Sequence, residues 1–304
     1  MDEFSCLRTP DIVTPVVRRH PGAWLHFGVA PARGRHRVLY AELHDLTREL
    51  LADGRAEEFF FLHKHPGLRV RWQTTRPQRA AVDGLLRQRL VTWRQEGLID
   101  EWHAGVYEPE EYLFGGPVSM RSVHRVFTAD SLAWLGFHGE PHGSPAGREG
   151  AGVRPAWAMS LLMVRALLDA LEIVGWEDLD VWDRLRRQTG RRYAAGLRAA
   201  GAAGPLAQVA RIEAALRAAW ADQETLAAAL PAGAERRVEE YRAAVARAGE
   251  RWLRTYFTAG NALIGPREAA AFVIVFHWNR AGLSVLRQTL IAEALTARPG
   301  GEHR

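Results

Sequence analysis

The sequence predicts an α+β fold: a small, mostly antiparallel sheet with helices in the N-terminal half, followed by a helical C-terminal half. Stretches in which apolar and polar residues alternate, as in strands, occur before residue 108. Two of them, residues 58–64 and 68–74, flank His65-Pro66-Gly67, a sequence typical of a turn between strands. From residue 156 onward, apolar residues instead recur at intervals of three and four, as on one face of a helix.

Length and composition predict one large domain. The chain has 304 residues, enough to bury a core of good size, and its 47% hydrophobic and 25% charged residues are ordinary for a soluble globular protein. Residues 138–155 are rich in glycine and proline and predict a flexible linker or flap. We therefore expect one domain over residues 1–304, with a mixed part at 1–137, this linker, and a helical part at 156–304.

Composition also disfavours several classes of protein. The single cysteine, Cys6, excludes an internal disulfide framework and is typical of a reducing cytosol. The first residues lack the pattern of a secretory signal, and the longest apolar run, residues 269–276, is too short to cross a bilayer. We therefore expect a cytoplasmic protein with no membrane partner.

The net charge of +5 comes from arginine, because Lys64 is the single lysine. Abundant arginine and alanine are typical of a GC-rich genome, and a second interpretation is that arginines bind an acidic partner. Nucleic-acid-binding motifs are missing, so we expect no nucleic acid partner. Phosphate-binding loops, nucleophile elbows and His-Glu-x-x-His are missing as well, and we expect no cofactor.

The first half is predicted to hold about four strands and three helices, with helices over one face of the sheet. Leucines at intervals of three and four indicate the first helix, which stops near Gly54. The predicted strands are residues 24–29, 58–64, 68–74 and 99–107, and the predicted helices are residues 39–54, 80–96 and a third that begins at Ser119.

One predicted strand carries two arginines on a single face. Arg69 and Arg71 alternate with apolar residues, so the two arginines face one side and the apolar residues the other. Two interpretations stay open: a solvated outer face of a half-buried sheet, or a rigid pair that binds an anion or a carbonyl oxygen. His63 and His65 alternate too, but zinc needs three or four converging ligands, so we predict no metal site.

The loop before Ser119 is the candidate for chemistry. It carries Tyr107 and Glu110, and the helix that follows adds His124 and Asp130. Phenol and carboxyl groups just ahead of a helix suit proton transfer, and loops between rigid elements often carry function. A solvated acidic turn that satisfies the first amides of the helix is an equally open interpretation.

In the second half, three apolar stripes predict helices at residues 157–171, 206–220 and 238–252. A last helix is predicted at residues 267–297 and begins apolar on nearly every face. His277, Asn279 and Arg280 lie within it, so these polar groups must be paired or must line a cavity.

Together these motifs resemble the thiopeptide-type bacteriocin biosynthesis family, stand-alone relatives of the lantibiotic dehydratase C-terminal elimination domain. The resemblance covers about residues 24–137 and 265–297. It implies a single elimination-domain-like unit, a leader-bearing, dehydrated and azole-containing precursor peptide as partner, and no cofactor, and it is compatible with a homodimer. The matching motifs are Phe59-Phe60-Phe61, His65-Pro66-Gly67-Leu68-Arg69-Val70-Arg71, Tyr107-Glu108-Pro109-Glu110, Phe114-Gly115-Gly116-Pro117, then His124, Phe127, Asp130 and Ser131, and finally His277 with Asn279-Arg280.

Two activities are known in the family that the chain resembles, and the sequence of the loop that carries Glu110 distinguishes them. Elimination domains remove glutamate from glutamylated Ser or Thr, and their loop typically reads Glu-x-x-Arg-Tyr-Gly-Gly, with a catalytic arginine. Here Glu110 keeps the glutamate position, but Leu113 and Phe114 replace the arginine and tyrosine. A leucine cannot bind the departing glutamate. The loop is similar instead to that of the pyridine synthases, which join two dehydroalanines by a formal aza-[4+2] cycloaddition and then expel water and the leader.

The resemblance implies that Tyr107, Glu110 and His277 transfer protons. The residues implied in substrate binding are Arg69, Arg71, Ser119, His124, Asp130, Asn279 and Arg280. Two alternatives remain: a glutamate-elimination subunit of a split dehydratase, and a non-catalytic peptide-binding subunit of a modification complex.

Overall fold

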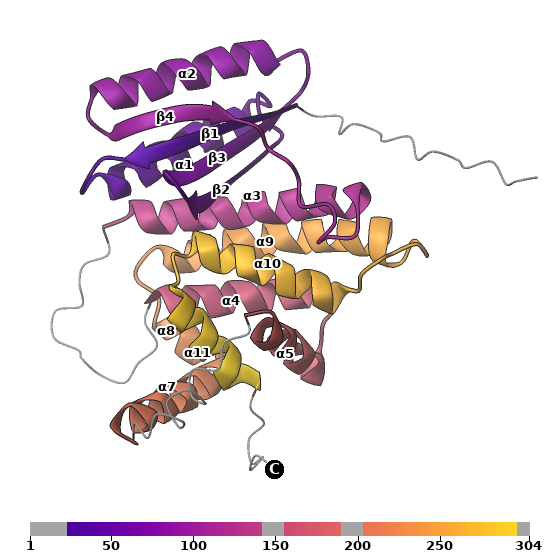
Figure 1. Cartoon of the computed structure of the whole chain (residues 1–304). Helices are drawn as coiled ribbons and strands as arrows, with labels where there is room; N and C mark the ends of the chain where they lie inside the picture. Colours follow the sequence, from indigo (N-terminus) through magenta and orange to yellow (C-terminus); the bar gives the residue numbers. More distant parts are fainter. Residues whose placement is uncertain (1–22, 142–154, 190–202, 297–304) are drawn as a thin grey trace, which may run out of the picture.

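The computed structural model describes residues 23–141, 155–189 and 203–296 (Figure 1). The elements of the first half are β1 (Ala23–Pro31), α1 (His36–Ala52), β2 (Glu58–Lys64), β3 (Gly67–Thr74), α2 (Arg79–Gln95), β4 (Ile99–Gly105) and α3 (Pro117–Gly139). Those of the second half are α4 (Pro155–Ala170), the 3-10 helix η1 (Gly175–Glu177), α5 (Asp178–Thr189), α7 (Ala203–Ala221), α8 (Gln223–Ala228), α9 (Ala234–Trp252), the π-helix η2 (Leu253–Phe257), α10 (Pro266–Arg280) and α11 (Val285–Thr296).

The four strands form one antiparallel sheet in the order β2-β3-β1-β4, which confirms the predicted α+β class. Its apolar face holds side chains such as Phe27 and Trp72, both buried. Helices α1 and α2 cover this face: Trp72 Nε1 donates to Thr47 of α1, and the guanidinium of Arg87 of α2 lies over the Phe27 ring. Figure 1 shows α2 stacked on β4 and β1.

The outer edge of β2 is closed by side chains rather than by another strand. Its outward amide groups meet oxygen acceptors from α3 and α10, which satisfies the edge and excludes a further strand there. This edge therefore joins the sheet to the helical part. The pairs are Phe59 N with Thr128 Oγ1 at 2.9 Å, Phe61 N with Ser131 Oγ at 3.3 Å, and His63 N with Asn279 Oδ1 at 2.8 Å.

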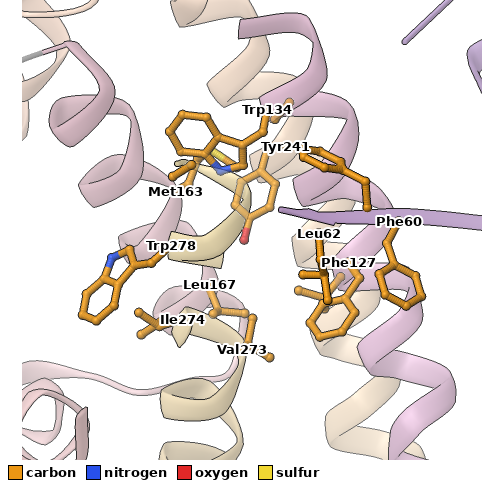
Figure 2. Packing of buried hydrophobic residues seen from close by; sticks show 14 of the residues in the cluster. Phe60, Leu62, Phe127, Trp134, Met163, Leu167, Tyr241, Val273, Ile274 and Trp278 are labelled. Atoms are coloured by element: carbon orange, nitrogen blue, oxygen red, sulfur yellow. The ribbon is translucent and has the colours of Figure 1, made fainter. Parts of the chain in front are cut away.

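The helical part packs in layers beneath α3 (Figure 1). Figure 2 shows Phe60 and Leu62 of β2 against Phe127 of α3, with Trp134 and Tyr241 beside them. Large aromatic side chains bury much apolar area each and dominate such a core. The tryptophans that are fully buried are Trp72, Trp93, Trp134, Trp182, Trp252 and Trp278.

Several predicted boundaries were wrong, among them the start of the first helix, which begins at His36 rather than Leu39. The last helix is broken, because Gly282 adopts φ +65° and its amide bonds to the Asn279 carbonyl, a glycine ending for α10. Helix α3 begins at Pro117 rather than Ser119, since proline suits the first turn. The strand predicted at 99–107 ends at Gly105.

The predicted linker is corrected at both of its ends. Its first two residues belong to α3, which continues to Gly139, and its last, Pro155, begins α4. The rest of the predicted linker lies outside the described residues, as does the N-terminal segment that holds Cys6.

Candidate functional site

The Tyr107 hydroxyl lies between an acid and a base. It donates to Glu110 Oε2 at 3.1 Å and lies 2.9 Å from His124 Nε2. The ring is held edge-on by Trp24 at 5.0 Å and Phe60 at 5.3 Å between ring centroids. Burial raises the pKa of Tyr107, and the neighbouring Glu110 carboxyl raises it further. The phenol is therefore neutral and able to pass a proton between its two partners.

Arg71 lies against this phenol and is only 4% exposed. Its guanidinium carbon is 4.8 Å from the Phe60 ring centroid and 4.7 Å from that of Tyr107. Burial lowers the pKa of Arg71, whereas Tyr107 and Glu110 act to raise it. Within the described residues, Nε and Nη1 are buried and have no hydrogen-bond partner. Leaving such donors unpaired is costly, so the arrangement suits an oxygen-bearing ligand.

A basic strip continues from Arg71 over the sheet. Arg71 pairs with His26 across β3 and β1, and Arg69 pairs with Gly28, over which the ring of His103 lies. His26 donates from Nδ1 to the Val106 carbonyl at 2.9 Å. Burial lowers the pKa of His26; the bond to Val106 opposes this, and the charges of Arg71 and Arg69 add to it. Burial and the two arginine charges thus both disfavour the protonated form of His26.

The loop that carries Tyr107 and Glu110 is anchored by Phe114. Its ring is fully buried, and ring-centroid distances of 6.0 Å link it to α3 and α10. Gly115 follows at φ +74°, and a Cβ there would lie 1.9 Å from the Tyr256 hydroxyl, so only glycine fits. That hydroxyl accepts the amides of Leu263 and Ile264 at 2.9 and 3.2 Å. The loop is therefore held against the α9–α10 connection, which fixes the position of Glu110.

A second polar cluster lies in the interior and is centred on His277. Its Nδ1 lies 2.5 Å from Asp130 Oδ1, and its Nε2 lies 2.8 Å from Ser160 Oγ. Arg280 binds the other oxygen of Asp130. Burial acts to raise the pKa of Asp130, but the charges of Arg280 and His277 outweigh it and hold that pKa below its usual range. All four residues are at most 2% exposed, so a substrate has no direct access.

The structure brings together part of the predicted set. Tyr107 bonds to both Glu110 and His124 beside Arg71, with Arg69 on the same sheet face. The solvated outer-face interpretation fails for Arg71, which is buried against the rings of Phe60 and Tyr107.

The other predicted residues lie elsewhere. Asp130 and Arg280 join His277 in the interior cluster, and Asn279 also donates from Nδ2 to the His63 carbonyl at 3.0 Å. Ser119 is buried and accepts from Trp252 Nε1 at 2.8 Å.

Sequence reasoning missed Trp24 and His26 as members of the site. A signal was present: both alternate with the apolar residues of β1 and so face the same side as each other. Only the β1–β3 register, which sets His26 opposite Arg71, shows that this is the arginine side.

The described ranges 23–141, 155–189 and 203–296 hold neither a candidate metal centre nor a candidate membrane span. No group of three or more His, Cys, Asp and Glu side chains gathers there as metal ligands would. No helix in those ranges combines the length and apolar character needed to span a bilayer.

The chain matches the model of a known protein family. Residues 24–298 match the model described as lantibiotic biosynthesis dehydratase C-term. No curated protein matches. A solved structure, the tRNA dependent lantibiotic dehydratase MibB from Microbispora sp. 107891, aligns with TM-score 0.58 and 19% identity over 93% of this chain. The chain spans 28% of the length of MibB, and this likeness shows the fold alone.

A second solved structure is the pyridine synthase TbtD from thiomuracin biosynthesis. It aligns with TM-score 0.44 and 18% identity over 89% of this chain and 97% of TbtD. A likeness at that level carries no argument about mechanism.

Proposed function

Because the chain belongs to the lantibiotic biosynthesis dehydratase C-terminal family, we propose that it is a pyridine synthase, a macrocyclase acting on a modified precursor peptide. The observation that carries the proposal is the loop around Glu110. It retains Tyr107 and Glu110 as a hydrogen-bonded pair, while Leu113 supplies no charge at the position where elimination domains typically have arginine. A neutral proton relay without that arginine suits cyclisation better than release of glutamate.

The proposed reaction needs no oxidant or reductant. One dehydroalanine and the preceding amide, as its iminol tautomer, form a four-atom C=C–N=C unit. This unit adds across the C=C of a second dehydroalanine, so that two carbon–carbon bonds form and a six-membered ring results. The iminol hydroxyl and one ring hydrogen leave as water. The leader then leaves as its carboxamide with a second ring hydrogen, and a pyridine remains.

The site would assist in two ways. Holding both alkenes in reacting geometry is worth up to about 7–11 kcal/mol in favourable cases. Tyr107, between Glu110 and His124, would move the amide proton to oxygen and later protonate the leaving groups. The unpaired Nε and Nη1 of Arg71 would bind the oxygen of the iminol or of a neighbouring carbonyl.

His277, proposed by resemblance to transfer a proton, would act as a positioning residue. It binds Asp130, which binds Arg280, and the guanidinium carbon of Arg280 lies 4.4 Å from the Phe127 ring centroid. Phe127 in turn packs on Phe60 at 5.4 Å between centroids, and Phe60 supports Arg71.

A second candidate function is glutamate elimination in a split dehydratase. The strip formed by His26, Arg69, Arg71 and His103 favours it, because a released glutamate is an anion. A non-catalytic peptide-binding role is the third candidate.

One experiment separates the three functions. A dehydrated, azole-containing precursor peptide and its glutamylated counterpart are each incubated with the protein and followed by mass spectrometry. Loss of the leader plus water supports the pyridine synthase. Loss of glutamate from the glutamylated peptide alone would replace it by elimination, and two unchanged masses with retained binding would leave the peptide-binding role.

A further inference from the structure

A hollow away from the Tyr107 cluster lies between α1, α3 and α9. Its volume is about 420 Å³, and its lining includes His44 and the charged residues Arg48, Arg237, Glu240 and Arg247. The part of α3 that borders it is apolar. We call this hollow the α1–α3–α9 recess.

The recess carries an excess of positive charge. Within the described part of the chain, Arg48 and Arg247 are exposed and have no hydrogen-bond or ion-pair partner. The single lining carboxyl, that of Glu240, already faces Arg236 on the same helix at 3.8 Å. Burial lowers the pKa of His44, and after the opposing bond to Asp45 the charges of Arg237 and Arg48 lower it further. The field inside therefore favours an anion.

The side chain of Arg237 is held in one position by its contacts with α3. The residue is 9% exposed, and its guanidinium binds the Glu140 carboxylate at the end of α3. It lies so close to Gly136 that a Cβ there would be 1.8 Å from Nη1. Its Nε is buried without a hydrogen-bond partner in the described residues. A preset guanidinium loses little freedom when it binds a carboxylate.

We propose that the α1–α3–α9 recess binds carboxylate side chains of an acidic peptide segment, and that, if the proposed function holds, this segment belongs to the leader of the precursor peptide. The apolar α3 wall suits the methylene groups of glutamate. Nucleic acid fits less well, because the recess admits only one or two side chains and its aromatic residue, Tyr241, is buried rather than free to stack.

The recess and the Tyr107 cluster are placed to serve one substrate. Leu132 borders the recess, and His124 belongs to the cluster on the same helix. Eight residues of α3 correspond to about 12 Å along the axis. At about 3.3 Å per extended residue, at least about four residues of peptide would link the two.

The test uses the intact protein and a fluorescent hexaglutamate peptide, with hexaglutamine as the neutral comparison. Binding is followed by anisotropy in wild type and in the double variant Arg48→Glu/Arg247→Glu. The matched control is Arg79→Glu/Arg89→Glu on α2, which makes the same change of charge at two exposed arginines. We expect the recess variant to bind hexaglutamate at least about tenfold more weakly than wild type, since attraction becomes repulsion. The affinity of the control should change by less than about twofold.

Two further readouts separate this inference from the proposed function. The proposed recess site is wrong if hexaglutamate binding weakens equally in the recess and control variants, or if hexaglutamine binds as tightly as hexaglutamate. Either result holds whether or not the protein turns over the precursor. An RNA oligomer that displaces hexaglutamate and binds more tightly through the same two arginines would overturn the peptide as ligand. If hexaglutamate binds as expected but wild type leaves the precursor mass unchanged, the recess stands and the proposed function fails. If wild type turns over the precursor, the KM for the precursor should be roughly fivefold or more higher in the recess variant, and kcat should stay within about twofold of wild type.

Discussion

At the residue scale, the chemistry of the candidate site depends on side chains that are polar but poorly solvated. Arg71 has two buried donors without a described partner, and Tyr107 is kept neutral between Glu110 and His124. Both arrangements cost folding free energy unless a ligand uses them. The interior cluster also holds buried donors without a described partner, Nη1 and Nη2 of Arg280, but its residues are at most 2% exposed. Tyr107 and Glu110 are partly exposed, and function is therefore assigned to their cluster.

Replacing Tyr107 with phenylalanine removes the proton relay and leaves the ring. We expect Tyr107→Phe to slow loss of the leader plus water by roughly 10²–10⁴-fold while the thermal midpoint changes little. Tyr112→Phe is the control, because Tyr112 is 96% exposed. Turnover by mass spectrometry, with circular dichroism as the folding check, decides the matter; equal rates in both variants would remove Tyr107 from the mechanism.

Glu58 predicts a pH dependence of stability. Burial raises its pKa from 4.5 to about 7, against the opposing effects of Thr128 and Arg125. The folded-state pKa exceeds the unfolded one, so the stabilisation is full below about pH 4.5 and is lost as pH rises through 7. We expect the unfolding free energy of wild type, relative to Glu58→Gln, to fall by on the order of 2–3 kcal/mol over that window.

Urea midpoints at several pH values measure this difference. Subtracting the Glu58→Gln values removes the contribution of His63 and His44, whose pKa values burial lowers and which act in the opposite direction. Glu57→Gln is the matched control, since Glu57 is the exposed neighbour. A parallel pH dependence of wild type and Glu58→Gln would contradict the assignment.

At the element scale, α3 is the helix on which most of the arguments meet. It presents His124 to Tyr107, hydroxyls to the β2 edge, Asp130 to His277 and Gly136 to Arg237. Because one rigid helix holds all of these groups, the spacing between the loop, the interior cluster and the recess is set by 1.5 Å per residue. Changes at its contacts should therefore affect more than one of them.

Leu113→Arg tests the loop as a unit. In a pyridine synthase the new charge should not increase leader loss and should disturb a site meant for a neutral peptide. In an elimination enzyme it should restore or increase glutamate release. Tyr112→Arg places the same charge one residue away on an exposed side chain and serves as control. Glutamate release that rises in Leu113→Arg, with no leader loss in wild type, would sink the cycloaddition proposal.

Helices α4 and α9 cross at a close approach that requires glycine. A Cβ at Gly249 would lie 2.3 Å from the Ala170 carbonyl oxygen, so backbone must move to admit it. We expect Gly249→Ala to lower the unfolding free energy by roughly 1–3 kcal/mol. Gly84→Ala in α2 meets nothing within 4 Å and should instead stabilise by about 0.5–1 kcal/mol. Urea denaturation compares the two, and similar midpoints would show that the helices separate easily.

At the scale of the whole molecule, the sheet and the helical part are joined by polar contacts as well as by the core. The Asn279 side chain accepts a hydrogen bond from the His63 amide and donates one to the His63 carbonyl. The interior cluster connects α3, α4 and α10 through Asp130, Ser160 and His277. An aromatic pair, Phe127 with Phe60, then reaches the sheet (Figure 2). Disturbing the cluster should loosen the molecule and misplace Arg71 together.

His277→Ala tests that coupling. It leaves Asp130 buried with one partner fewer, and we expect a loss of unfolding free energy of about 3–5 kcal/mol together with slower turnover. Ser160→Ala removes one hydrogen bond and should cost about 1 kcal/mol. Unfolding and turnover are measured on the same preparations. Full stability of His277→Ala with a rate lower by about 10²–10⁴-fold would show direct proton transfer instead.

The sequence by itself determined the local features. Alternation at Arg69 and Arg71 predicted a strand with one basic and one apolar face, and leucine spacing predicted α1, because side-chain direction follows from backbone geometry within a few residues. Tyr107 and Glu110 were predicted as candidates for proton transfer in one loop, and in the structure they bond to each other. The family, too, was predicted from motifs along the chain and is confirmed over residues 24–298.

Only the tertiary structure decided which distant residues share a site. His124 and Asp130 lie on one helix, yet one faces Tyr107 and the other faces His277, a difference set by what packs against each side of α3. The burial of Arg71 likewise depends on Phe60 of the neighbouring strand and on Tyr107 of a loop distant in sequence. Sequence spacing carries no information on such contacts, since they follow from how rigid elements close over one another after the local structure is formed.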